Sequence, residues 1–119
     1  MKNADKHMPF DVFASRCSSR AAYEHIFSRW GMLVLARLEQ GPSRFNEMAR
    51  SIDGISERML SKTLKILEEE MVISRKDYGE RPPRVEYSLT ESGRRITIKL
   101  LGLIEQLYTE LELRDSTGK

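Results

Sequence analysis

The stretch from Ser56 to Leu89 constrains the fold of this chain more than any other. It opens with apolar residues at helical spacing, and at about 100° per residue four of them fall within an arc of about 60°. These four are Leu60, Leu64, Leu67 and Met71. The opposite side carries Arg58, Ser61, Lys62 and Lys65. We therefore predict a helix, capped by Ser56, with one face that packs and one basic face.

A β-hairpin is predicted directly after this helix. Residues 72–78 (VISRKDY) and 84–89 (RVEYSL) have the alternation and the β-branched or aromatic content of two short strands. The residues between them, GERPP, cannot continue a helix. Because Pro82 and Pro83 fix φ at two consecutive positions, we expect the tip of the hairpin to be stiff.

Four other segments are predicted to be helical from their apolar spacing and their capping residues. The predicted ranges are Ser18 or Ser19 to about Phe27, Trp30 to the Gly41-Pro42 stop, residues 44–52 with Ser43 as cap, and the Thr90 cap to about Leu113. The third of these meets the Ser56 helix at a tight turn, Asp53-Gly54-Ile55. The fold class is therefore mainly α with a small antiparallel β-hairpin, in the order of a winged helix-turn-helix.

The last predicted helix is more apolar than a monomer requires. Its apolar arc is about 160° wide, whereas a surface helix usually shows a stripe of about 100°. The excess predicts a second copy of the chain as partner, so that the N- and C-terminal helices dimerise. The expected interface consists of Ile96, Leu100, Leu103, Ile104, Leu107, Tyr108 and Leu111.

The length of 119 residues fits one domain. We expect a partly flexible arm (1–16), a winged helix-turn-helix domain (17–89), a dimerisation helix of the same domain (90–113) and a tail (114–119). The arm lacks the apolar run of a signal peptide, and no segment reaches the length of a membrane span. These features predict a cytoplasmic protein with no membrane partner.

Within a helix-turn-helix, the second helix enters the major groove of DNA, and a basic outer face suits that role. The sequence resembles the HxlR-type branch of winged-helix transcriptional regulators, which are neighbours of the MarR family. The residues that carry the resemblance are Cys17, Trp30, 41–56 (GPSRFNEMARSIDGIS), 60–70 (LSKTLKILEEE) and 82–93 (PPRVEYSLTESG). It implies a homodimer, joined through the first and last helices, on a dyad-symmetric operator.

The chain departs from the family pattern in three places. Ser18 stands where a Pro usually follows the cysteine, and Ser28-Arg29 stands where a Gly-Lys or Gly-Gly pair often precedes the tryptophan. Met71 stands where the family usually has a Gly that ends the recognition helix. A Gly takes a positive φ freely, whereas a Met there would be strained by about 1 kcal/mol. We therefore expect the helix to run on or to end differently.

Ten residues are candidates for contact with double-stranded DNA. Arg58 is the best candidate for a guanine edge, because its planar guanidinium matches two acceptors in the major groove. The wing contributes Arg81 and Arg84, which could also simply pair with Glu80 and Glu86. The full set is Ser43, Arg44, Asn46, Ser56, Arg58, Ser61, Lys62, Lys65, Arg81 and Arg84. The first three could donate to a phosphate or serve only as a helix cap.

Cys17 is the one cysteine of the chain, so it cannot form an intrachain disulfide. It precedes a predicted helix N-terminus, with Arg16 and Arg20 nearby, and both features favour a reactive thiolate. Members of the resembling family sense electrophiles or oxidants through a cysteine here. An inert, partly buried thiol is the equal alternative.

The sequence indicates a transcriptional regulator, a repressor rather than an activator by expectation, and not an enzyme. No nucleotide fingerprint or catalytic triad is present, and His7 and His25 lack ligands at metal-site spacing, so we expect no cofactor and no metal. The net charge is only +2, and acidic residues balance basic ones between residues 56 and 87. A winged-helix module that binds proteins rather than DNA therefore remains the alternative.

Overall fold

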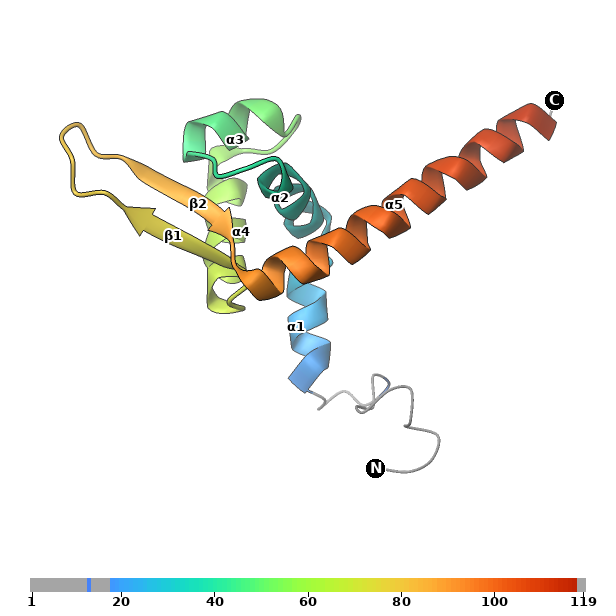
Figure 1. The fold of residues 1–119 in the computed structure, drawn as a ribbon, viewed down its shortest axis with the longest axis horizontal. Coiled ribbons are helices and arrows are strands. Elements are labelled where there is room, and N and C mark those ends of the chain that lie inside the picture. The colour runs from blue at the N-terminus through green and yellow to red at the C-terminus, as the bar shows by residue number, and fades with distance from the viewer. Residues whose placement is uncertain (1–12, 14–17, 118–119) are drawn as a thin grey trace.

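The computed structural model describes Phe13 and residues 18–117, so the predicted arm and Cys17 lie outside the described residues apart from Phe13. Five helices and one two-stranded antiparallel sheet follow in the predicted order (Figure 1). They are α1 (Ser18–Ile26), α2 (Arg29–Glu39), α3 (Phe45–Ser51), α4 (Glu57–Glu69), β1 (Ile73–Asp77), β2 (Val85–Leu89) and α5 (Glu91–Thr117). The predicted fold class is confirmed.

The core lies where α2, α4 and the first half of α5 meet. Val34 and Leu35 of α2 are fully buried, as are Leu60 and Leu67 of α4. The leucine face predicted for α4 is therefore the face that packs. Burial of each such side chain contributes about 1.5–3 kcal/mol, so this face fixes the orientation of α4 in the fold.

The end of α4 differs from the expected packing pattern at Met71. Ser56 caps the helix as predicted, since its hydroxyl oxygen accepts a hydrogen bond from the Met59 amide at 3.0 Å. The helix ends at Glu69, and Met71 has a φ of 62°. The interpretation of Met71 as part of the packing face is wrong, because the chain turns away there and leaves the side chain 71% exposed.

Ser43 was expected to cap α3, and this expectation is wrong. Arg44 occupies the N-cap position. Ser43 instead pairs with Tyr87 of β2 through two backbone hydrogen bonds of 2.9 and 2.8 Å. The extended segment before α3 thus forms an isolated antiparallel bridge with β2. Ser43 is only 1% exposed in this position.

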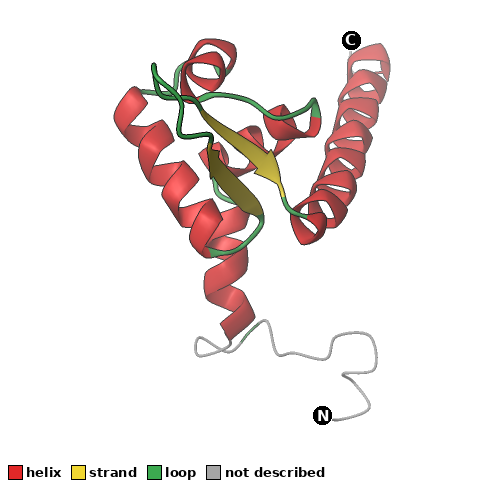
Figure 2. Ribbon diagram, turned by 60° about the vertical axis from the view of Figure 1, so that its left-hand side comes forward, coloured by secondary structure: helices red, strands yellow, loops and turns green. Residues whose placement is uncertain are grey.

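The hairpin has the predicted strands, with Ile73 opposite Leu89 and Asp77 opposite Val85. Figure 2 shows the two strands facing the viewer, with α5 standing to one side. A final hydrogen bond, from the Tyr78 amide to the Arg84 carbonyl at 2.9 Å, closes the ladder before the tip. Backbone hydrogen bonds thus join the two strands as far as the Tyr78–Arg84 pair, and the tip extends beyond the core.

Helix α5 begins where predicted and ends later. The Thr90 hydroxyl accepts a hydrogen bond from the Gly93 amide at 3.0 Å, so Thr90 is the cap. The helix continues to Thr117, and residues 114–117 therefore belong to it rather than to a tail. The helix is about 40 Å long, and its outer part extends away from the body (Figure 1). Among the described residues, no helix is long and apolar enough to span a membrane.

Candidate nucleic-acid interface

The outer face of α4 carries the predicted basic residues together. Arg58, Ser61, Lys62 and Lys65 are all exposed, on the side opposite the buried leucines. Within residues 18–117, the three cations of this set take part in no ion pair. An unpaired cation on an exposed helix face is available to a phosphate or to the acceptor atoms of a base.

The start of α3 lies beside the outer end of β2 in the wing, which is the name we use for residues 73–89. Arg44 and Asn46 are exposed there, and with Pro83 and Val85 they line a groove of about 410 Å³. Arg50 also lines this groove, although the sequence analysis did not select it. Arg44 and Arg50 do not have the i, i+3 or i+4 spacing of one helix face, so the sequence pattern did not connect them.

Ser43 is buried rather than exposed, so its side chain is not available for the expected contact with a phosphate. Its hydroxyl is directed inward and donates to the Arg44 carbonyl at 3.3 Å. Glu47 contributes to the same helix start, because its carboxylate accepts the Arg44 amide at 2.8 Å. This hydrogen bond lowers the pKa of Glu47 below its ordinary value of 4.5.

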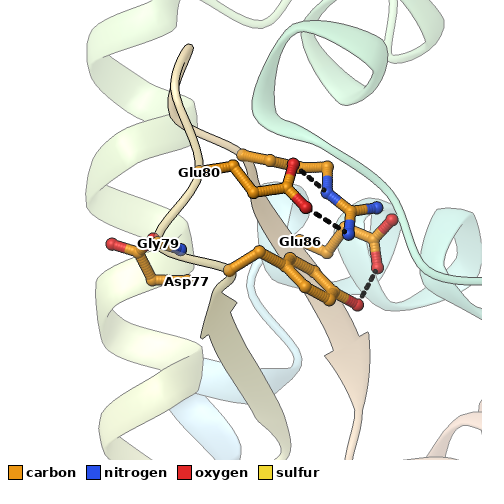
Figure 3. A network of polar contacts seen from close by, with 6 residues as sticks. Asp77, Gly79, Glu80 and Glu86 are labelled. Carbon is orange, nitrogen blue, oxygen red and sulfur yellow. Dashed lines mark hydrogen bonds and ion pairs between the residues drawn. The ribbon is translucent and has the colours of Figure 1, made fainter.

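Arg84 is held inside the wing. Its Nη2 donates to Glu80 Oε2 at 3.2 Å, and its Nε lies 3.2 Å from Glu80 Oε1 (Figure 3). The guanidinium also stacks 3.6 Å from the centre of the Tyr78 ring. The sequence left two roles open for Arg84, contact with DNA or pairing with a nearby glutamate, and the structure shows pairing with Glu80. We assign Arg84 to the internal structure of the wing.

Other polar groups of the wing also form hydrogen bonds within it. The Tyr78 hydroxyl donates to Glu86 Oε1 at 3.0 Å, which raises the pKa of Tyr78 above its ordinary value of 10. The Gly79 amide donates to Asp77 Oδ1 at 2.9 Å. Arg81 is exposed at the tip, and within the described part of the chain it has no ion-pair partner. The wing therefore presents Arg81 from a hairpin that its own side chains hold together.

The apolar face of α5 is divided between the core and the surface. Leu100 is only 6% exposed, so its assignment to an interface is wrong: it packs in the core of its own chain. Ile96 and Ile104 are half-buried against that core. The remaining predicted interface residues are exposed, namely Leu103, Leu107, Tyr108 and Leu111.

An apolar groove of about 470 Å³ runs between α5 and the first two helices. Phe27 and Met32, which the sequence analysis did not select, form its other wall, opposite Ile96 and Leu103. A second apolar groove of about 360 Å³ follows on α5 and includes Leu107. The exposed apolar surface thus extends from the core to the outer half of α5.

Residues 25–113 match the HxlR-like helix-turn-helix family. The HTH-type transcriptional regulator YtfH of Escherichia coli (strain K12), which is uncharacterised, is 41% identical over 103 residues, or 87% of this chain and 80% of that protein. A solved structure named as the transcriptional regulator YtfH from Salmonella typhimurium has a TM-score of 0.81 at 36% identity, covering 90% of this chain and 96% of that one. The structure of the redox regulator HypR in its oxidised form has a TM-score of 0.71 at 33% identity, and the match covers 78% of this chain and 96% of that one.

These similarities include the whole of α4, the wing and most of α5, which are the elements that form the exposed basic and apolar surfaces. They extend over most of this chain and most of each relative. The chain therefore belongs to the HxlR-like helix-turn-helix family and is a transcriptional regulator of the helix-turn-helix type.

Proposed function

We propose that this regulator binds duplex DNA as a homodimer on a dyad-symmetric operator and represses transcription from it. The observation that carries the proposal is the exposed, unpaired basic face of α4 beside a wing that presents Arg81. An α-helix fits the major groove, and a hairpin next to it can reach the adjacent phosphates or minor groove.

Each candidate residue other than Ser43 and Arg84 has a role in this proposal. Arg58, in the first turn of α4, reads a guanine edge. Lys62 and Lys65 contact bases or phosphates, while the hydroxyls of Ser56 and Ser61 supply shorter contacts. Arg44 and Asn46 contact a phosphate from the start of α3, Arg50 does so from the last turn of α3, and Arg81 does so from the wing. Such phosphate contacts position the protein on the duplex, and base contacts give specificity.

The homodimer is supported by the exposed apolar face of α5. Leu103 and Tyr108 are 68% and 65% exposed in the single chain, and they lie on a helix that extends from the body. Contiguous apolar surface of this kind marks an interaction site. In such a homodimer the two α4 helices would enter successive major grooves, so we expect half-sites about 10 bp apart or a multiple of it.

Gel shift with the duplex upstream of the regulator's own gene tests DNA binding. We expect specific binding that weakens steeply with salt, because each phosphate contact releases counterions. Arg58→Ala should lose about 1–3 kcal/mol and relax specificity at one base per half-site. Arg81→Ala should weaken binding to all sequences and reduce the salt slope by about 1. Arg114→Ala, on the exposed last turn of α5, is the matched control.

If the duplex does not bind, the proposal fails and the module that binds proteins is favoured. If Arg58→Ala and Arg81→Ala bind the duplex as the wild type does, the assignment of the DNA-contacting residues fails. The sign of regulation is tested separately by deleting the gene. Repression predicts a rise in transcripts from the adjacent operator, whereas a fall identifies an activator.

The proposal includes a response to oxidants or electrophiles through Cys17. Its support is the position before α1 in the sequence and the similarity to HypR, which is named a redox regulator. Operator binding measured before and after mild oxidation with diamide tests this part. We expect binding to change in the wild type and to stay constant in Cys17→Ser. Equal binding in all four samples removes the sensor role and leaves DNA binding intact.

A further inference from the structure

The imidazole of His25 in α1 contacts the C-terminal end of α4. Nδ1 of His25, in the last turn of α1, lies 2.6 Å from Oε2 of Glu70, the C-cap residue of α4. Because a carboxylate can only accept, the Nδ1–H of the imidazole donates this hydrogen bond. The Glu70 side chain is only 23% exposed, so the bond is partly shielded from water.

His25 reaches Glu70 from a fixed position. The hydroxyl of Ser28, which caps α2, donates to the His25 carbonyl at 3.0 Å and accepts the Gly31 amide at 3.1 Å. A side chain at Gly31 would lie 2.8 Å from the carbonyl oxygens of His25 and Ile26, so α1 and α2 meet closely here. Ile26 is itself buried in the core. The backbone of His25 is therefore held in place, and its imidazole forms the hydrogen bond to Glu70.

The first turn of α5 holds the same end of α4 from another direction. The hydroxyls of Thr90 and Ser92 donate to the Met71 carbonyl at 2.8 and 3.2 Å. The Thr90 amide donates to the Val72 carbonyl at 3.1 Å. The end of α4 is thus contacted from two sides: α1 binds Glu70, and the start of α5 binds Met71 and Val72.

We infer that His25 is a positioning residue for DNA recognition: through Glu70 it fixes the C-terminal end of α4 relative to α1. The inference rests on the proposed function, in which α4 reads the operator. A recognition helix that pivots at one end displaces its base-reading side chains, and displacements of about 1 Å weaken directional contacts strongly. Contacts to phosphates tolerate such movement better, since they are largely electrostatic.

Operator duplexes selected by the wild type from a randomised pool provide the probe, and an unrelated duplex measures non-specific binding. We expect His25→Ala to lose about fivefold or more in operator affinity, the lower range of coupling between sites. Its affinity for the unrelated duplex and its Tm should stay close to those of the wild type. His25→Asn, whose amide nitrogen can occupy the position of Nδ1, should restore operator affinity. Glu24→Ala is the control, because it removes an exposed ion-pair partner on α1 that has its partner within α1.

A double-mutant cycle completes the test. Once Glu70→Ala has been made, His25→Ala should add little further loss. Operator affinity equal to the wild type in His25→Ala, or losses in the two single variants that simply add, would overturn the inference while leaving DNA binding in place.

Hydrogen exchange separates this inference from the proposed function. The amides of residues 70–72 donate within the last turn of α4, to the carbonyls of Ile66, Glu68 and Leu67. We expect these amides to exchange faster in His25→Ala than in the wild type. If the pool yields no enriched sequence, the proposed function fails, and the exchange rates alone decide whether His25 fixes the end of α4. Unchanged exchange overturns that as well.

Discussion

Met71 is the one residue other than glycine with a positive φ in the described part of the chain. That conformation costs an ordinary side chain about 1–2 kcal/mol, and the exposed Met71 side chain recovers little of it by packing. Met71→Gly should therefore stabilise the fold by about 1 kcal/mol in urea unfolding. Met71→Ala keeps the strain and should leave stability nearly unchanged. An equal gain in both variants would show that strain is not the cause.

Glu47 should make stability depend on acid pH. Its pKa is lowered in the fold by the hydrogen bond from the Arg44 amide, so folding favours the charged form. The contribution is present above the unfolded value near 4.5 and is lost as the pH falls through the lower, folded value. Thermal unfolding from pH 7 to pH 3 should show a smaller decline in Tm for Glu47→Gln than for the wild type. Parallel declines would contradict this.

The junction between the hairpin and α5 depends on a close approach of two backbones. A Cβ at Gly93 would lie 1.9 Å from the Val72 carbonyl oxygen. Gly93→Ala must separate the two segments and should cost roughly 3 kcal/mol of unfolding free energy. Gly102→Ala is the control within the same helix, where an added Cβ meets no atom within 4 Å, and it should gain up to about 1 kcal/mol. Similar effects of the two changes would refute the close-approach argument.

The wing offers a test that separates positioning from contact. Because Glu80 neutralises Arg84, Arg84→Ala should lower operator affinity by loosening the hairpin, without changing the salt slope. Arg84→Lys should not restore affinity, since a lysine cannot stack on Tyr78 and pair with both oxygens of Glu80 at once. A reduced salt slope in Arg84→Ala would instead assign this residue to a phosphate.

The sequence predicted the elements well where a local pattern determines them. The leucine spacing of α4, the caps Ser56 and Thr90 and the Gly41-Pro42 stop all depend on neighbours within a few residues. The errors arose where distant segments decide the outcome. Ser43 looked like a cap because its pairing with Tyr87 lies 44 residues away in the chain. Leu100 looked like an interface residue because helical periodicity alone does not say which part of an apolar arc the core covers.

The same distinction holds for the candidate interface. Exposure of Arg58, Lys62 and Lys65 follows from periodicity and was predictable. The pairing of Arg84 was open, because either Glu80 or a phosphate satisfies a guanidinium at that spacing. The contact of His25 with Glu70 was not predictable, since it joins two helix ends that only the tertiary fold brings together.

At the scale of the whole molecule, the proposed homodimer requires association through the exposed apolar face of α5. Leu107→Glu places a charge in the exposed apolar face and should yield a monomer in size-exclusion chromatography with light scattering. Operator affinity should fall about 100-fold or more, because each half-site must then be bound independently. Thr109→Glu, on the opposite side of α5, should remain dimeric and bind normally. A dimeric Leu107→Glu would place the interface elsewhere.

The continuity of α5 also limits how such a chain can change during evolution. One helix runs without a break from the cap at Thr90 to Thr117. A single inserted or deleted residue between the core position Leu100 and the exposed Leu107 would rotate everything beyond it by about 100° and shift it by about 1.5 Å. In the proposed homodimer, the outer apolar face would then point away from the partner. Substitutions can accumulate along this helix, but the number of residues between these two positions cannot change without moving the proposed interface relative to the core.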